Sequence, residues 1–374
     1  MMKDGNPRHF YWIDWIRFLA ALMVVIGHTR FQHFTYYDEL LIPGKGKWSE
    51  FLFLIPRFAN EAVTVFFVLS GFLVGGRCLE RILTDRFDLG QYFVDRFTRI
   101  LLPLVPVVLL TWMVTWIRGE PISVVEGLGN IASVQGVFVK PMTNNTSLWS
   151  LSYEVWFYVA AGAVALVVTG SSLRGKVWGL ILAFTSMAIF TRLEASYFFI
   201  WMLGALAYFI GRDPGRIVML LSGGMLALLG AVSAALGTEV NSLDIGWISG
   251  LIPPRLLSLM LLGFGVSLAL PPLVVFAPVG RIGKMAESCG SMLAASSYSL
   301  YLIHRPVLKL WGHMGGDQAY TRFDAWSLTM FALKIMSCLL AGWLFYLLFE
   351  KQTVHVRRML MRRNPVTPPA ECRL

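Results

Sequence analysis

Residues 11–30 read YWIDWIRFLAALMVVIGHTR. An α-helix rises about 1.5 Å per residue, so this stretch is long enough to cross the hydrocarbon core of a bilayer. It nevertheless carries Asp14, Arg17 and His28, and an ionisable side chain at bilayer depth costs roughly 2.5–3.5 kcal/mol even on lenient scales. Arg17 and His28 are eleven residues apart, which places both on one helix face, about 16 Å apart along the axis. The stretch therefore predicts a membrane helix whose polar face looks into a bundle.

The composition is that of a polytopic membrane protein. The chain of 374 residues is 56% hydrophobic and 14% charged, with a mean hydropathy of +0.63, whereas soluble domains are about a quarter charged. The basic residues behind the formal charge of +10 fall between apolar runs, which argues against a nucleic-acid partner. Four cysteines, Cys78, Cys289, Cys338 and Cys372, lack metal-ligand spacing, and we expect no metal site.

The apolar runs predict an all-α helical bundle with about ten transmembrane helices in the lipid bilayer. The fifth and sixth runs are short, and a re-entrant hairpin is the alternative there. The chain is predicted to be one membrane domain, residues 1–374, with residues 350–374 as a basic cytoplasmic tail. The predicted spans cover roughly residues 12–31, 59–77, 98–117, 148–169, 177–191, 196–211, 217–236, 254–270, 291–311 and 326–349.

The distribution of basic residues predicts the orientation. Most of the 32 lysines and arginines lie in segments that face the cytoplasm if the N-terminus is inside, and these include Lys3, Arg8, Arg212 and Arg373. Loops rich in Lys and Arg stay on the cytoplasmic side. We therefore expect both termini in the cytoplasm.

Two further spans carry features of packing or binding. The second span contains Gly71 and Gly75 at the small-xxx-small spacing that allows helices to pack closely. At the start of the third span, Arg96 and Arg99 lie about one turn apart and face the same way. They are either an ordinary positively charged flank or a guanidinium fork, which can bind phosphate groups bidentately.

The fourth and ninth spans place polar groups at membrane depth. Glu154 lies in SLWSLSYEVWFY (147–158) among aromatic residues, where a carboxylate is unexpected. His28 is also near the outer end of its span, so we expect Glu154 to pair with His28 and orient its ring. The ninth span holds Tyr301, His304 and Arg305, too many polar groups for a helix that faces only lipid.

These motifs together resemble acyltransferase family 3, a family of integral membrane proteins that includes bacterial O-antigen and exopolysaccharide O-acetylases. They occur in the order typical of the family and cover nearly the whole chain. The matching pieces are Arg17 with ten residues before His28, FFVLSGF at 66–72 with Ser70, Arg96-x-x-Arg99, SLSYE at 150–154 with Ser152 and Glu154, and SYSLYLIHRP at 297–306 with Tyr301 and His304.

The resemblance implies a membrane O-acyltransferase of the bacterial cytoplasmic (inner) membrane. It implies an acyl-CoA donor, usually acetyl-CoA, which enters from the cytoplasm as co-substrate, with no permanently bound cofactor. The acceptor would be a hydroxyl of an exported carbohydrate, such as exopolysaccharide, lipopolysaccharide or a lipid-linked glycan. By the same resemblance, His28 is essential for transfer and Arg17 lies on the donor path.

We therefore expect His28 and Glu154 to be catalytic and Arg17, Arg96 and Arg99 to bind acyl-CoA. His28 either deprotonates the acceptor hydroxyl or carries the acyl group itself. The remaining expected pocket-lining residues are Ser70, Ser152, Tyr301 and His304. The family's last span typically ends in Glu-Lys-Pro, whereas Gln352 follows Glu350 and Lys351 here, so Glu350 receives no strong role.

A secondary transporter or flippase is the alternative function, because intramembrane Arg, His and Glu also mark substrate and proton pathways. The two halves of the chain show no matching pair of interrupted spans, which is the usual sign of a transporter site. Consumption of a thioester distinguishes the two functions, since a transporter would leave acyl-CoA intact.

Overall fold

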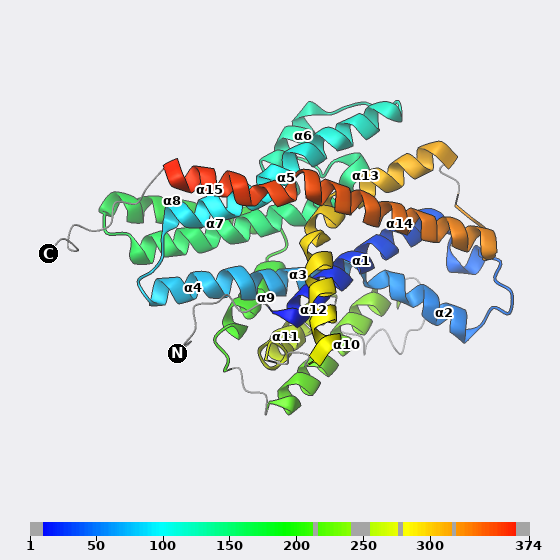
Figure 1. Cartoon of the computed structure of the whole chain (residues 1–374), viewed down its shortest axis with the longest axis horizontal. Helices are drawn as coiled ribbons and strands as arrows, with labels where there is room; N and C mark the ends of the chain where they lie inside the picture. The colour runs from blue at the N-terminus through cyan, green and yellow to red at the C-terminus, as the bar shows by residue number, and fades with distance from the viewer. Residues whose placement is uncertain (1–9, 212–215, 241–254, 276–279, 316–318, 364–374) are drawn as a thin grey trace.

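The computed structural model is a bundle of helices (Figure 1), and it describes residues 10–211, 216–240, 255–275, 280–315 and 319–363. Within these ranges the regular elements are all helical, apart from isolated β-bridges. The predicted all-α fold is therefore confirmed. Among the described residues, eight helices or continuous helical stretches are long and apolar enough to span a membrane: Tyr11–His33, Ile55–Leu83, Leu89–Ile117, Thr143–Thr169, Leu173–Phe190, Ile217–Leu236, Arg255–Leu273 and Ala325–Met361.

The helices that build the candidate site come from both ends of the chain. They are α1 (Tyr11–His33), α3 (Ala59–Ser70), a π-helical segment (Gly71–Gly75), α4 (Gly76–Leu83), α5 (Leu89–Ile117), α7 (Trp149–Thr169) and α13 (Ser297–Gly315). The π segment joins α3 to α4 without a break in the rod, and π-bulges of this kind are frequent at functional sites. Around them lie α8 (Leu173–Phe190), α9 (Ser196–Ala207), α10 (Ile217–Val240), α11 (Arg255–Leu273) and α14 (Ala325–Leu348).

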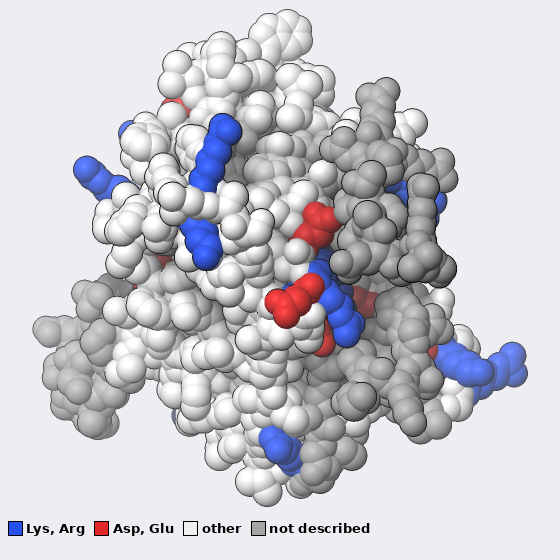
Figure 2. All heavy atoms as spheres, turned by 90° about the vertical axis from the view of Figure 1, so that its left-hand side faces the viewer, with Lys and Arg blue, Asp and Glu red and all other residues white. Residues whose placement is uncertain are grey.

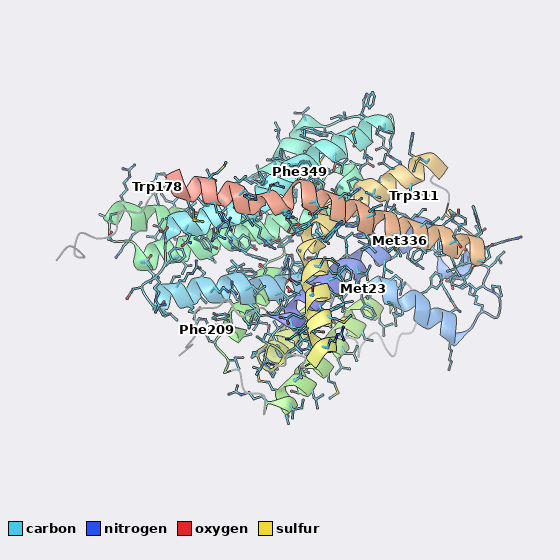
Figure 3. All side chains as sticks on the ribbon, in the orientation of Figure 1. Met23, Trp178, Phe209, Trp311, Met336 and Phe349 are labelled. Atoms are coloured by element: carbon cyan, nitrogen blue, oxygen red, sulfur yellow. The ribbon has the colours of Figure 1, made fainter. Side chains whose placement is uncertain are left out.

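The outer surface of the bundle is apolar. Trp178 on α8 and Met336 on α14 are labelled in Figure 3 and are 53% and 60% exposed, and Leu228 on α10 is 63% exposed. A soluble protein rarely exposes apolar area on this scale. In a bilayer the same side chains face lipid tails, so the protein is a multi-pass membrane protein.

Close packing between the second span and α9 depends on glycines, as the sequence predicts. A Cβ atom on Gly71 would overlap the backbone of Trp201, and one on Gly204 would overlap the backbone of Val68. The two helices therefore touch backbone to backbone, which keeps the π segment against α9. Small residues allow this approach in membranes, where van der Waals packing drives helix association.

Two predicted spans need correction. The span at 196–211 ends as a helix at Ala207, and this 12-residue helix is only about 18 Å long, too short to cross the bilayer alone. The span at 291–311 combines two helices, because α12 (Gly280–Ala295) ends just before α13 begins. Helix α12 runs across the long helices (Figure 1) and packs on α1, where Trp15 Nε1 donates to Ala286 O at 3.1 Å.

The predicted cytoplasmic side corresponds to one end of the bundle. The turns between α4 and α5 and between α7 and α8 lie at this end, as does the end of α15 (Thr353–Arg363) (Figure 1). Basic and acidic side chains occur together on it (Figure 2). Lys3, Arg8, Arg212 and Arg373, on which the orientation also depends, lie outside the described residues, so both termini in the cytoplasm stays a prediction.

Part of the predicted tail, residues 350–374, is helical and packs on the bundle. Its first part forms α15, which runs along α5 and holds an ion pair between Arg357 and Asp95 at 2.5 Å. Because α15 is amphipathic, it covers the side of α5 next to Asp95 instead of extending freely. Residues 364–374 lie outside the described part of the chain.

Candidate active site

A cavity of about 300 Å³ lies inside the bundle, between α1, the second span, α5, α7 and α13. Part of its wall is apolar, with Val63, Phe66 and Phe67, and four arginines make another part of it basic. The polar side chains that line it are Arg17, Ser70, Arg77, Arg96, Arg99, Ser150, Glu154, Tyr158, Ser297, Tyr298 and Tyr301.

The predicted polar face of α1 is confirmed. Arg17 Nη2 lies 3.5 Å from Ser297 Oγ, and His28 Nδ1 lies 2.8 Å from His304 Nε2, so both side chains face α13. Arg17 also lies at 4.0 Å from Asp14, one turn earlier on the same helix. However, only Arg17 lines the cavity.

The two arginines predicted as a fork, Arg96 and Arg99, do share one direction, because both line the cavity from α5. Arg99 is surrounded by helices on all sides, yet its side chain is accessible because it borders the cavity. Arg96 lies over the ring of Tyr158 with its Cζ 5.6 Å from the ring centroid. Arg77 from α4 also lines the cavity and is exposed, whereas the sequence predicts only an ordinary cytoplasmic residue there.

Glu154 belongs to the arginine cavity, and its predicted pairing with His28 is wrong. Tyr158 donates to Glu154 Oε1 at 2.5 Å, and Ser70 Oγ lies 3.1 Å from the Tyr158 hydroxyl. His28 instead contacts His304, and the same nitrogen of His304 lies close to the hydroxyl of Ser147. Glu154 follows Ser147 by seven residues, which is about 10 Å along a helix toward the predicted cytoplasmic side. The sequence places both groups in the outer half of their spans but does not supply this offset.

His28 pairs with His304, and the pair is tied to backbone. His304 is fully buried, its Nδ1 lies 2.7 Å from Tyr301 O, and its Nε2 lies 2.8 Å from His28 Nδ1 and 3.3 Å from Ser147 Oγ. The two imidazole planes differ by only 5°. His28 itself is half-buried, so part of this residue remains accessible.

Tyr301 separates the cavity from the histidine pair. Its hydroxyl donates to Ser147 O at 2.8 Å and lies 2.7 Å from Ser150 Oγ, and its ring centroid is 5.9 Å from that of His304. Ser70 and Tyr301 line the cavity as predicted. His304 and Ser152 do not, and Ser152 is fully buried with its hydroxyl donating to Trp149 O.

Glu350 lies in the site, although the sequence analysis assigns it no strong role. It is 7% exposed, and Oε2 accepts hydrogen bonds from Ser299 N at 3.2 Å and Ser299 Oγ at 2.6 Å. Its carboxylate interacts electrostatically with the guanidinium groups of Arg99 and Arg17. A carboxylate at the end of the last span, in an otherwise apolar segment, was the available signal. The departure from Glu-Lys-Pro at Gln352 argues against a role for Glu350, but the structure places its carboxylate in the site.

Metal chemistry finds no support in the part of the chain that the structure describes, where no three His, Cys, Asp or Glu side chains are grouped as ligands. Cys78, Cys289 and Cys338 are free thiols, and Cys372 lies outside the described residues. The site is therefore described by its arginines, carboxylates, hydroxyls and the histidine pair.

Comparison with protein-family models identifies a family for the chain. The family model of acyltransferase family 3, described as an acyltransferase domain, matches residues 10–359, which is nearly the whole chain. Comparisons with curated proteins and with solved structures gave no match. The matched range contains every helix of the candidate site.

Proposed function

Because the chain belongs to acyltransferase family 3, we propose that it transfers an acyl group, most simply acetyl, from cytoplasmic acyl-CoA to a hydroxyl of an exported or cell-surface carbohydrate. The proposed setting is the bacterial inner membrane. The observation that carries the proposal is a cavity with four arginines on one side of Tyr301 and an accessible histidine on the other.

The arginines suit the donor's phosphate groups. Coenzyme A carries several phosphate charges, and a guanidinium binds phosphate through two parallel hydrogen bonds. Arg77 comes from α4, and Arg96 and Arg99 come from α5, which follows α4 through a turn on the predicted cytoplasmic side. Glu154 and Glu350 lie among the arginines and offset part of their charge.

His28 supplies the chemistry in either of two ways. As a base, it takes the proton of the acceptor hydroxyl while the oxygen bonds to the thioester carbonyl carbon. The carbon–sulfur bond then breaks, and the departing thiolate takes the proton back from the imidazolium. As a nucleophile, the ring nitrogen bonds to the carbonyl carbon first, the carbon–sulfur bond breaks, and coenzyme A leaves as a thiolate. The acceptor oxygen then bonds to the same carbon and displaces the ring, and the proton of the acceptor hydroxyl passes to the thiolate.

Both routes require the thioester to pass Tyr301. The pantetheine arm is long and thin, and the cavity side of Tyr301 is where its reactive end would arrive. Transfer thus requires the Tyr301 side chain to turn away and break the hydrogen bonds of its hydroxyl with Ser147 and Ser150.

The test is donor consumption by the purified protein in liposomes. Wild-type protein with acetyl-CoA and an extract of surface glycans should release free thiol and place labelled acetyl on glycan, and His28→Ala protein should do neither. Transport of labelled glycan with no release of thiol would overturn the proposal and favour a transporter. Mass spectrometry of glycans from cells with and without the gene then identifies the acceptor.

A further inference from the structure

The hydrogen bonds of His304 determine which of its ring nitrogens carries hydrogen. Nδ1 lies 2.7 Å from Tyr301 O and 3.3 Å from Leu300 O. Carbonyl oxygens only accept hydrogen bonds, so Nδ1 is the protonated nitrogen. In a neutral ring the other nitrogen, Nε2, then has a lone pair and accepts.

The neutral form of His304 is the one that its surroundings favour. The ring is fully buried, and the next residue is Arg305, whose charge lies near both histidines. Besides His28, the side chains that contact His304 are Ser147 from the segment before α7, Cys338 from α14 and Tyr301 from α13 itself, and none of them is a carboxylate. A second buried cation beside Arg305 would have no counter-ion among the described neighbours, and such a charge is costly.

The tautomer of His28 follows from that of His304. With a lone pair on His304 Nε2, the contact of 2.8 Å is a hydrogen bond only if His28 Nδ1 carries the hydrogen. Two lone pairs facing each other at this distance would repel. When Nδ1 of the neutral His28 ring carries the hydrogen, the lone pair of His28 is on its Nε2. Within the described residues, His28 Nε2 makes no hydrogen bond.

From this geometry we propose that His304 is a positioning residue that holds His28 in the Nδ1–H tautomer and so makes Nε2 the reacting atom. The inference rests on the proposed function for its catalytic meaning, although the tautomer itself does not. It serves both routes, because a base and a nucleophile each need the Nε2 lone pair. A chain of hydrogen bonds from His28 through His304 to Tyr301 O takes the part that a carboxylate takes in hydrolase triads.

The size of the effect has a precedent in those triads, where the wrong histidine tautomer lowers kcat by about 10⁴-fold. The matched variants are His304→Gln, whose side-chain oxygen accepts from His28 Nδ1, and His304→Met, which is similar in length but a poor acceptor. We expect the Gln variant to keep kcat within about 10-fold of wild type. The Met variant should lose about 10²–10⁴-fold in kcat with the KM for acyl-CoA unchanged.

His33→Gln is the matched control. His33 lies on α1, the helix of His28, is fully buried and forms a hydrogen bond with Ser327 O at 2.7 Å, and it does not line the cavity. This variant measures the loss of stability from replacing a buried histidine, while His28 and His304 stay unchanged. Thermal unfolding of all three variants separates a loss of fold from a loss of positioning.

The second measurement reads the tautomer directly. Nitrogen-15 NMR of histidine-labelled protein in bilayers, with the His28→Ala spectrum subtracted, should show His28 with a protonated Nδ1 and a bare Nε2, and the His304→Met variant should lose this pattern. A protonated Nε2 in wild-type protein, or wild-type kcat in His304→Met, would overturn the inference. A wild-type protein that consumes no thioester instead removes the proposed function, while the NMR result still decides the tautomer.

Discussion

His28 Nδ1 and His304 Nε2 lie 2.8 Å apart, although 276 residues separate them in the chain. The contact joins the first membrane helix to α13, and the same two helices meet again at Arg17 and Ser297. One helix pair therefore holds both the cationic end and the imidazole end of the site. This arrangement leads to the predictions that follow.

Replacing His28 by Ala should lower the rate of acyl transfer by at least about 10²-fold, because positioned acid–base catalysis typically contributes 10²–10⁴-fold. Folding should persist, since the ring is only half-buried. The measurement is thiol release from acetyl-CoA together with the elution profile of the purified variant. Near wild-type transfer by well-folded His28→Ala protein would show that the histidine is not the reacting group.

Replacing Arg17 by Lys should raise the KM for acyl-CoA several-fold. Lysine keeps the charge but loses the planar fork that binds phosphate or carboxylate through two bonds. Arg174→Lys is the control, because Arg174 is exposed at the same end of the molecule and lies outside the cavity. Equal KM values for the two variants would remove Arg17 from the donor site.

Replacing Glu154 by Gln should change donor binding but not the pH profile of kcat. The carboxylate lies with Tyr158 and the arginines, not with His28, so its removal alters the charge around the donor alone. Initial rates over a range of acetyl-CoA concentrations and pH values measure both effects. A shifted kcat profile would instead indicate that Glu154 reaches His28 during the reaction.

Replacing Gly71 by Ala should destabilise the protein by about 1–3 kcal/mol, because the added methyl group overlaps the backbone of Trp201. Gly224→Ala is the matched control on α10, where a Cβ meets nothing within 4 Å. That change should be neutral or stabilise by about 0.5–1 kcal/mol, since alanine favours helix. Thermal unfolding in detergent gives both values, and equal melting temperatures would contradict the close contact between the second span and α9.

Replacing Glu120 by Gln should remove a pH-dependent part of the stability. Hydrogen bonds from Asn144 and Arg118 hold the pKa of Glu120 below its usual value. A lowered folded-state pKa stabilises the protein above the unfolded-state pKa, and this contribution is lost as the pH falls through the folded-state pKa.

Wild type should therefore melt above Glu120→Gln at pH 7, and the difference should shrink at pH values below the usual glutamate pKa of about 4.3. Melting curves at both pH values measure it. A difference that does not change with pH would mean that the carboxylate's charge is not what stabilises this loop.

The helices and the polar face of α1 are predictable because they depend on local periodicity. Apolar runs of membrane length mark the spans, and the eleven-residue spacing of Arg17 and His28 sets their common direction. The close packing at Gly71 is likewise predictable, from the small-xxx-small spacing of Gly71 and Gly75. The helix boundaries near Ala207 and Ala295 are less predictable, because short apolar helices and full spans look alike in a hydropathy pattern.

The partners within the site are not predictable in this way. The sequence predicts that Glu154 and His28 both lie in the outer half of the membrane. In the structure Glu154 lies about two turns along α7 from the level of the histidine pair, and His304 takes the position expected for the carboxylate. Glu350 joins the arginines from a segment that reads as the start of a tail. Both facts depend on how helices slide and rotate against each other.

The amino-acid sequence by itself determined that this protein is a helical membrane bundle with ionisable groups facing inward, because the cost of exposing charge or backbone to lipid leaves no other arrangement. Only the tertiary structure decided that His28 pairs with His304, that Glu154 stays with the arginines and that Tyr301 stands between them. The reason is that hydropathy constrains each helix separately, whereas the register between helices is set by side-chain packing across the whole bundle.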